Sequence, residues 1–411
     1  MGGVSRVGIE KIGVWPGTLS LGMRELCEAR GHDIAAVRDD MLIDERSVSP
    51  LWEDPVTMAV NAARTMLSAE DRASIELLIV ASESGVDYEK SMSTWVHRYL
   101  DLTPHCRNFE LKHACYGGTA GLQMAAHWIA SGLHRGAKAL LICTDQSRTH
   151  LGQPWEYVLG ASATAVLVSD TPALAEIEVG KSGFWTFEVS DLTRPTGLVE
   201  TGNSETSLIS YLEALEGAFD HFVERFPEAA DYDRTFYRHI YHAPFGGMTQ
   251  RAHKTILRRF GLSKHDTQAN FVRKTLPSLA YVRRLGGSYS ASTFVELLAL
   301  ADHADDLPAG ARISMFSYGS GSCAEFYSLC ACEDARRVAA AAGVPALLDA
   351  RHALTVSQYE AIETARTALV DQGNYQIAFD EPPCCFGRRY EGRQHLIFTG
   401  MKDFYRQYAW S

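Results

Sequence analysis

The segment FELKHACYGGTAGLQMAAHWIASG, residues 109–132, carries one cysteine, Cys115, shortly before two glycines and a helical pattern. Small neighbours such as Ala114 and Gly118 leave room for a substrate and let backbone amides approach the sulfur. A thiol at a helix N-terminus also feels the positive end of the helix dipole, which favours the thiolate. Free cysteines are more often inert core residues, so a nucleophilic role for Cys115 depends on the residues around it.

Short apolar runs alternate with helical patterns on both sides of this segment, which predicts an α/β protein with largely buried sheets. The first part contains the predicted strands IELLIVAS (75–82), AKALLICTD (137–145) and ATAVLVSD (163–170), and predicted helices at 55–69 and 118–133. The second part repeats this plan with a strand at 236–245, a helix at 289–304, and a strand, glycine turn and second strand or helix at 312–330. We therefore predict two similar halves, residues 1–170 and 171–411, with a polar loop at 187–207 near the active site.

Each half has a polar residue where an apolar strand ends. Glu83 follows IELLIVAS, where partial burial would raise its pKa and suit it to general acid–base chemistry. His242 ends the strand FYRHIYHAPF, and equivalent positions in duplicated halves would bring both residues to one cleft near Cys115. A surface acid and a structural histidine are the alternatives for these two residues.

The segment FSYGSGSCAEF contributes a glycine turn to the same hypothesis. Backbone N–H groups at Gly319, Ser320 and Gly321 could stabilise a developing oxyanion. The alternative is an ordinary structural turn.

Composition restricts the class of protein. The chain has 411 residues and a formal charge of −11. Its nine cysteines are an odd number, and the sequence shows no secretory signal, so we predict a cytoplasmic protein whose cysteines are reduced. The acidic balance argues against nucleic-acid binding, and no apolar run is long enough for a membrane span. Nucleotide-binding glycine motifs are absent, and no metal site is expected from the later cysteines, which lack zinc-ligand spacing: Cys323, Cys330, Cys332, Cys384 and Cys385.

One stretch reverses the overall charge. Between residues 251 and 284 the only acid is Asp266, and the basic residues are Arg251, Lys254, Arg258, Arg259, Lys264, Arg273, Lys274, Arg283 and Arg284. Such a run forms either a solvated helix face or a docking surface for an acidic partner.

In order and spacing, ESGVD, ACYGGTAG, YHAPFGGM and FSYGSG resemble the signature segments of 3-hydroxy-3-methylglutaryl synthases of the thiolase superfamily. The similarity covers essentially the whole chain. The stretches ESGVDYEKSMSTWVHRYLDL and FELKHACYGGTAGLQMA most resemble the branch that installs β-branches during polyketide biosynthesis. The resemblance implies a thiolase-like fold of two α/β halves, layered α-β-α-β-α, and a homodimer.

The resemblance also implies roles for the site residues. Cys115 would take an acetyl group from a donor thioester, Glu83 would remove a proton from its methyl, and His242 would hydrogen-bond the acceptor ketone. Gly319 and Ser320 would position the substrate or its oxyanion. No metal or redox cofactor is implied.

In the polyketide branch both substrates are expected on acyl carrier proteins, which are acidic and bear a phosphopantetheine arm. Arg30 resembles an arginine of that branch that is suited to the pantetheine phosphate. The basic stretch then becomes a candidate carrier contact, with the residues Arg251, Lys254, Arg273 and Lys274.

One position departs from the family pattern. The segment LGGSYSAS places Gly287 where the family has an asparagine that would help hold a substrate carbonyl, and Ser288 or Ser290 could substitute.

Three other functions stay open. They are an isoprenoid hydroxymethylglutaryl-CoA synthase using acetyl-CoA and acetoacetyl-CoA, a decarboxylating β-ketoacyl synthase, against which Glu83 and Gly287 argue, and a catalytically silent carrier-binding scaffold.

Overall fold

Nine strands form one long mixed sheet through the centre of the molecule, in the order β11-β12-β13-β8-β1-β7-β6-β4-β5. The computed structural model describes residues 6–133, 135–147, 151–379 and 385–411. The strands of this sheet are β1 Gly8–Trp15, β4 Ile75–Ala81, β5 Arg107–Leu111, β6 Lys138–Gln146, β7 Ala161–Ser169, β8 Ala175–Thr186, β11 Arg238–Tyr241, β12 Arg312–Gly319 and β13 Cys323–Ala331. The stretch after the glycine turn at 319–321 is therefore a strand.

The sheet contains the same pairing pattern twice. Strands β1, β7 and β6 pair antiparallel in turn, and β6 pairs parallel with β4. In the same way β8, β13 and β12 pair antiparallel, and β12 pairs parallel with β11. The strand pairs that join the two sets are Gly8 with Glu176 and Ile9 with Ala175, and a Cβ at Gly8 would lie 2.1 Å from the Ala175 carbonyl oxygen. The predicted boundary at residue 170 falls between β7 and β8, just before this junction.

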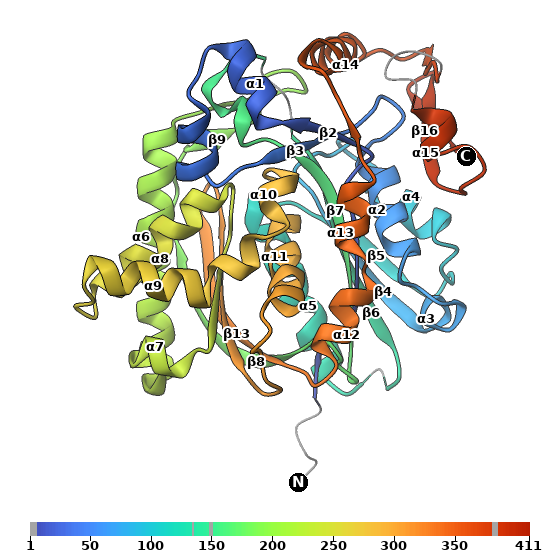
Figure 1. Cartoon of the computed structure of the whole chain (residues 1–411). Coiled ribbons are helices and arrows are strands. Elements are labelled where there is room, and N and C mark those ends of the chain that lie inside the picture. Colours follow the sequence, from blue (N-terminus) through green and yellow to red (C-terminus); the bar gives the residue numbers. More distant parts are fainter. Residues whose placement is uncertain (1–5, 134, 148–150, 380–384) are drawn as a thin grey trace.

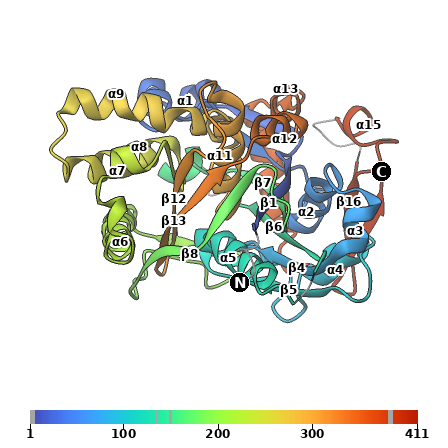
Figure 2. The ribbon, with the colours of Figure 1, turned by 90° about the horizontal axis from the view of Figure 1, so that it is seen from below.

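Helices cover both faces of each set of strands (Figures 1 and 2). Helices α5 (Gly117–Ala130) and α11 (Ser290–His303) lie in the middle layer, while α2 (Pro55–Arg64) and α6 (Ser204–Arg225) cover the outer faces. Along β4, Leu77 and Ile79 join the core that contains α5 and α11, and Leu78 and Val80 join the core that contains α2. This alternation follows from the two-residue period of a strand. The layered arrangement is the predicted one, and the fold prediction is confirmed.

Shorter elements surround this framework. The remaining α-helices are α1 Met23–Arg30, α3 Ala69–Ser74, α4 Ser93–Tyr99, α7 Tyr232–Thr235, α8 Gly246–Arg258, α9 Lys264–Lys274, α10 Val282–Leu285, α12 Ala335–Ala341, α13 Val344–Asp349, α14 Val356–Ala368 and α15 Phe386–Arg389. The remaining strands are β2 Leu19–Gly22, β3 Glu45–Val48, β9 Leu192–Thr193, β10 Thr201–Gly202, β14 His352–Ala353, β15 Tyr375–Gln376, β16 Leu396–Lys402 and β17 Tyr405–Trp410. In the part of the chain that the structure describes, no helix is both long and apolar enough to cross a membrane.

Two features differ from the sequence-based expectation. The helix predicted over 55–69 ends at Arg64, because Ser68 caps a separate helix, α3, by accepting from the Asp71 N–H. Most of the buried apolar residues after β14 do not join the cores of the second half. Tyr359, Tyr390 and Leu396 belong to the same hydrophobic core as Trp52 of the first half, so the C-terminal segment covers the outer side of that half.

Candidate active site

Cys115 lies in a single 3₁₀ turn, Ala114–Tyr116, between β5 and α5. Ala114 has φ 40°, in the left-handed region that residues with a Cβ rarely adopt, so the chain turns sharply before the cysteine. Ser290, the first residue of α11, fixes this turn. Its Oγ donates to the Cys115 carbonyl at 2.9 Å and accepts from the Gly118 N–H at 2.9 Å. The second half of the molecule therefore holds the cysteine segment of the first half.

The electrostatics of Cys115 differ from the sequence-based expectation. Cys115 as a whole is partly exposed, but its thiol is buried, and this burial raises the pKa of the thiol well above 9.0. The carboxylates of Glu83, Asp145 and Asp191 raise this pKa further. Helix α5 begins only at Gly117, two residues after the cysteine. The predicted stabilisation of the thiolate by the helix dipole is outweighed, and the resting thiol is protonated at neutral pH.

Glu83 lies two residues beyond the end of β4. Burial raises its pKa to about 7, while Lys112, Arg194 and the nearby backbone amides of Ala114 and His113 favour the charged form. One of its carboxylate oxygens, Oε1, is buried and has no hydrogen-bond partner among the described residues. The predicted rise in pKa is confirmed, and Glu83 is not a solvated surface acid.

His242 is the first residue after β11 and is almost fully buried. The Tyr211 hydroxyl donates to its carbonyl at 2.8 Å, and Ser292 Oγ lies 3.5 Å from its Nδ1. Burial lowers the pKa of the imidazole to about 3, so the ring is neutral. Ser290 and Ser292 occupy the first turn of α11, and this one turn contacts both the Cys115 segment and His242.

The glycine turn after β12 packs directly against the cysteine segment. A Cβ on Gly319 would lie 2.6 Å from the His113 carbonyl oxygen and 2.8 Å from the Tyr116 nitrogen, so no side chain fits there. Ser320 follows in the same turn. Asp191 holds this turn by accepting from the Gly321 N–H at 3.0 Å and from the Tyr318 hydroxyl at 2.9 Å.

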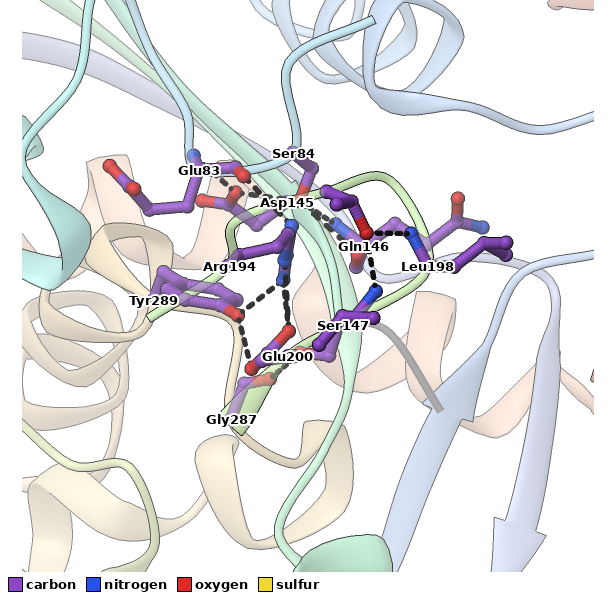
Figure 3. Close-up of polar contacts among 12 residues, drawn as sticks. Glu83, Ser84, Asp145, Gln146, Ser147, Arg194, Leu198, Glu200, Gly287 and Tyr289 are labelled. Atoms are coloured by element: carbon purple, nitrogen blue, oxygen red, sulfur yellow. Dashed lines mark hydrogen bonds and ion pairs between the residues drawn. The ribbon is translucent and has the colours of Figure 1, made fainter. Parts of the chain in front are cut away.

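Several polar residues near Glu83 were missed by sequence analysis (Figure 3). Asp145 accepts from the Glu83 N–H at 2.8 Å, and Arg194 donates to the Glu83 carbonyl at 2.8 Å. Asp145 lies at the end of β6, just as Glu83 and His242 follow their strands, so its position on AKALLICTD was a usable signal. Arg194 lies in the polar loop at 187–207, where the sequence does not tell in which direction a side chain points.

Two predicted carrier contacts have other partners. Arg30 pairs with Glu156 at 2.9 Å and with Glu360 at 2.7 Å, so its guanidinium is already bound to two carboxylates. Lys274 is buried and donates to the carbonyls of Asp233 and Phe236, so it cannot contact a carrier on the surface. The prediction for Lys274 is therefore corrected, while the role of Arg30 stays a prediction.

The other predicted carrier contacts are accessible. Arg251 and Arg273 are exposed on α8 and α9, and Lys254 is partly exposed on α8.

Gly287 has no room for the asparagine that the family pattern carries. Its N–H donates to the Val158 carbonyl at 2.7 Å, and a Cβ would lie 2.7 Å from the Pro244 carbonyl oxygen. Ser288 is paired with Ser162 at 2.8 Å, and Ser290 holds the cysteine segment. Both serines therefore have structural partners already.

Metal ligation has no support in the part of the chain that the structure describes, where no group of three or more His, Cys, Asp or Glu side chains could hold an ion. Cys384 lies outside the described residues.

Comparisons with known proteins agree with this geometry. Residues 261–382 match the family described as hydroxymethylglutaryl-coenzyme A synthase, C terminal. The chain is 38% identical to the polyketide biosynthesis 3-hydroxy-3-methylglutaryl-ACP synthase PksG of Bacillus subtilis (strain 168), over 98% of this chain and 99% of PksG. It is 32% identical to the hydroxymethylglutaryl-CoA synthase of Enterococcus faecalis, over 90% and 97% of the two chains.

Solved structures give the same result. The crystal structure of the HMG synthase of the curacin biosynthetic pathway superposes with a TM-score of 0.94 at 40% identity, covering 99% of this chain and 100% of that chain. Other crystal structures of that synthase contain its donor-ACP in the holo, acetyl and apo forms.

Proposed function

The chain belongs to the hydroxymethylglutaryl-CoA synthase family, and from this membership we propose that it adds an acetyl-derived carbon to the β-ketone of a polyketide intermediate, with both substrates on acyl carrier proteins. The observation that carries the proposal is the end-to-end match to PksG, whose name specifies a carrier-protein substrate. The identity to the CoA-dependent relative of Enterococcus faecalis is lower, 32% against 38%. The activity is that of a carbon–carbon bond-forming acyltransferase.

The first half-reaction loads Cys115. Its sulfur attacks the acetyl carbonyl, the bond to the carrier's pantetheine sulfur breaks, and the thiol proton leaves with the departing thiol. Because burial keeps the Cys115 thiol protonated, this proton must move as the acyl group is transferred. The donor carbonyl oxygen would lie against the turn that contains Gly319 and Ser320, where backbone N–H groups can stabilise the developing charge.

The second half-reaction forms the carbon–carbon bond. Glu83 takes a proton from the acetyl methyl, and the resulting carbon attacks the acceptor's β-ketone. The ketone oxygen takes up one proton as the bond forms, which balances the proton removed from the methyl and gives the 3-hydroxy group. Neutral His242, whose Nε2 has no partner among the described residues, would hydrogen-bond the ketone oxygen. Water then hydrolyses the thioester at Cys115, which regenerates the thiol and leaves a 3-hydroxy-3-carboxymethyl acyl thioester on the acceptor carrier. No metal or redox cofactor enters these steps.

An exposed basic face favours carriers over free CoA. Arg251, Lys254 and Arg258 lie at spacings of three and four on α8, and therefore on one face of the helix. Burial and the charges of Lys264, Arg258 and Arg251 lower the pKa of Lys254, as expected where cations crowd together. The ion pairs of this region involve Arg259 and Lys274. Among the described residues no ion pair is formed by Arg251, Lys254, Arg258 or Lys264, so these side chains are free to bind an acidic carrier.

A homodimer is part of the proposal. Strand β5 is an edge of the nine-stranded sheet, and its residues Asn108 to Leu111 are only partly buried. An unpaired edge strand is a template for pairing with another chain. Sedimentation equilibrium should give twice the chain mass of 45.3 kDa, and a purely monomeric protein would contradict the dimer.

The catalytic proposal is tested by following the two half-reactions separately. Incubation with acetyl-carrier protein should add one acetyl group to Cys115, detected by mass spectrometry, and acetyl-CoA at equal concentration should react far more slowly. Cys115→Ala should gain no acetyl group. Glu83→Gln should gain it but form no condensed product on an acetoacetyl-carrier.

Two of the alternative functions have their own outcomes in this experiment. Equal loading from both donors would favour the CoA-dependent synthase. A wild-type protein that never becomes acetylated would favour the silent scaffold.

A further inference from the structure

Polar side chains from other elements bind both polar backbone groups of Glu83. The N–H of Glu83 donates to Asp145 Oδ1 at 2.8 Å, and its carbonyl accepts from Arg194 Nη1 at 2.8 Å (Figure 3). Asp145 is almost fully buried and also accepts from the Ser84 hydroxyl at 2.9 Å. The backbone of Glu83 is thus fixed from two sides, which limits the directions that its carboxylate can take.

Arg194 joins three separate parts of the molecule. It lies in the connection between β8 and α6, and its Nε and Nη2 bind Glu200 of the same connection at 2.9 and 2.5 Å. Its Nη2 also donates to the Tyr289 hydroxyl at 2.9 Å. The side chains of Arg194 and Glu200 are 19% and 10% exposed, so this network is shielded from solvent.

Tyr289 connects this network to the rest of the active site. It immediately precedes α11 and has φ 49°, a left-handed conformation that a residue with a side chain holds only when its surroundings enforce it. The next residue, Ser290, holds the Cys115 carbonyl, and Ser292 faces His242. Arg194 therefore ties the Glu83 loop to the helix that positions the other two site residues.

We propose that Arg194 is a positioning residue for the condensation step, because it fixes the Glu83 backbone relative to α11. Its positive charge also favours the carboxylate form of Glu83. This inference rests on the proposed role of Glu83 as the base. Loading of Cys115 does not need that base, so the main effect of losing Arg194 should fall on the second half-reaction. A misplaced base slows a reaction by about 100-fold for a displacement of about 1 Å.

The charge contribution has a sign that can be measured. The groups that face Glu83 are Lys112, Arg194, Asp145, Cys115 and the backbone amides of His113 and Ala114. Of these, Lys112 and Arg194 lower the pKa of Glu83 against burial. Removing the arginine charge should shift the acidic limb of the pH–rate profile to higher pH. Removing the opposing charge of Glu200 should shift it to lower pH.

The experiment compares three variants with wild-type enzyme by mass spectrometry of Cys115 acetylation and by product formation across pH 5.5 to 9. Arg194→Met should acetylate within about 3-fold of wild type, condense about 100-fold more slowly, and show its acidic limb at higher pH. Arg194→Lys keeps the charge but loses the planar fork, so condensation should slow while the limb stays in place. Glu200→Gln should move the limb to lower pH.

Other outcomes would overturn the inference. Wild-type condensation by Arg194→Met would do so, and so would an unmoved limb in both Arg194→Met and Glu200→Gln. Equal losses of acetylation and condensation in all three variants, with a lowered melting temperature, would mean a purely structural role. Glu83→Gln is assayed in parallel: if it condenses normally, the proposed function itself is wrong, and that result is distinct from a failure of Arg194 alone.

Discussion

At the scale of single residues, Ser290 links the two halves of the molecule at the Cys115 segment. Ser290→Ala removes the hydroxyl that donates to the Cys115 carbonyl and accepts from the Gly118 N–H. Leaving these buried groups unpaired should lower the free energy of unfolding by about 1–3 kcal/mol. The loosened cysteine segment should also acetylate at least about 10-fold more slowly.

A matched serine gives the control for this prediction. Ser162 is buried and its hydroxyl donates to Ser288 at 2.8 Å, and among the described residues it forms no hydrogen bond with the Cys115 turn. Ser162→Ala should lose stability in denaturant unfolding but keep the acetylation rate. Equal acetylation by Ser290→Ala and wild type would contradict the role of Ser290.

The pKa of Glu83 predicts the pH dependence of condensation. The base must be deprotonated, and burial raises its pKa to about 7, so the rate of condensation by pre-acetylated enzyme should rise between pH 6 and pH 8 and level off above that. Single-turnover assays with an acetoacetyl-carrier would measure this limb. A midpoint near the ordinary glutamate value of 4.5 would contradict the assignment.

Glu83, Cys115 and His242 could be proposed from the sequence because each follows an apolar strand or precedes a helix, and this pattern is visible without coordinates. It did not identify Arg194, because the partners of a loop side chain depend on tertiary contacts. The thiolate expectation for Cys115 failed for a related reason: burial and three neighbouring carboxylates oppose the helix dipole, and the sequence does not place those neighbours.

At the scale of elements, α8 offers a test of carrier docking. Arg251→Glu combined with Lys254→Glu reverses two charges on its exposed face. The KM for acetyl-carrier protein should rise about 10-fold or more, with little change in kcat, and the defect should shrink at high salt because exposed charges are screened. Initial rates at two ionic strengths would measure this.

The control reverses a basic charge elsewhere. Lys402→Glu, at the exposed C-terminal end of β16, should leave the KM unchanged. A similar increase in both proteins would point to net charge and not to a specific surface.

The basic run at 251–284 also shows what an element hides from sequence analysis. Arg259, Lys274, Arg283 and Arg284 pair with acids far away in the chain, namely Asp220, Asp233, Asp44 and Glu45. Only tertiary structure separates these paired residues from the free face of α8. The strands and helices themselves were predictable, because their periodicity reflects burial on one or both faces.

At the scale of the whole molecule, the duplicated plan was readable because each half repeats a strand, a polar strand end and a small-residue helix start. The packing of the C-terminal segment onto the first half could not be predicted from the sequence. Its apolar residues, such as Tyr359 and Leu396, indicate only that some core receives them, and the choice between the two cores depends on shape complementarity.

The attachment of this segment predicts a pH-dependent stability. Glu53 is almost fully buried, and its Oε1 accepts from Trp15 Nε1 at 2.7 Å and from the Tyr390 hydroxyl at 2.6 Å, which joins the first half to the C-terminal segment. Burial raises its pKa to about 7 from 4.5. The pKa of the folded state is the higher one, so the stability associated with the protonated acid is present at low pH and is lost as the pH rises through about 7.

Glu53→Gln should therefore remove this dependence. The glutamine keeps an oxygen that can accept from Trp15 and Tyr390 but never ionises, so the variant should gain relative to wild type by up to about 3 kcal/mol between pH 5 and pH 8. Denaturant unfolding at pH 5, 6, 7 and 8 would measure the difference. Subtracting the two curves cancels the contributions of the buried acids Glu83 and Asp145, which both proteins share. A difference that stays constant over this range would mean that Glu53 does not titrate there and that its charge does not weaken the attachment of the C-terminal segment.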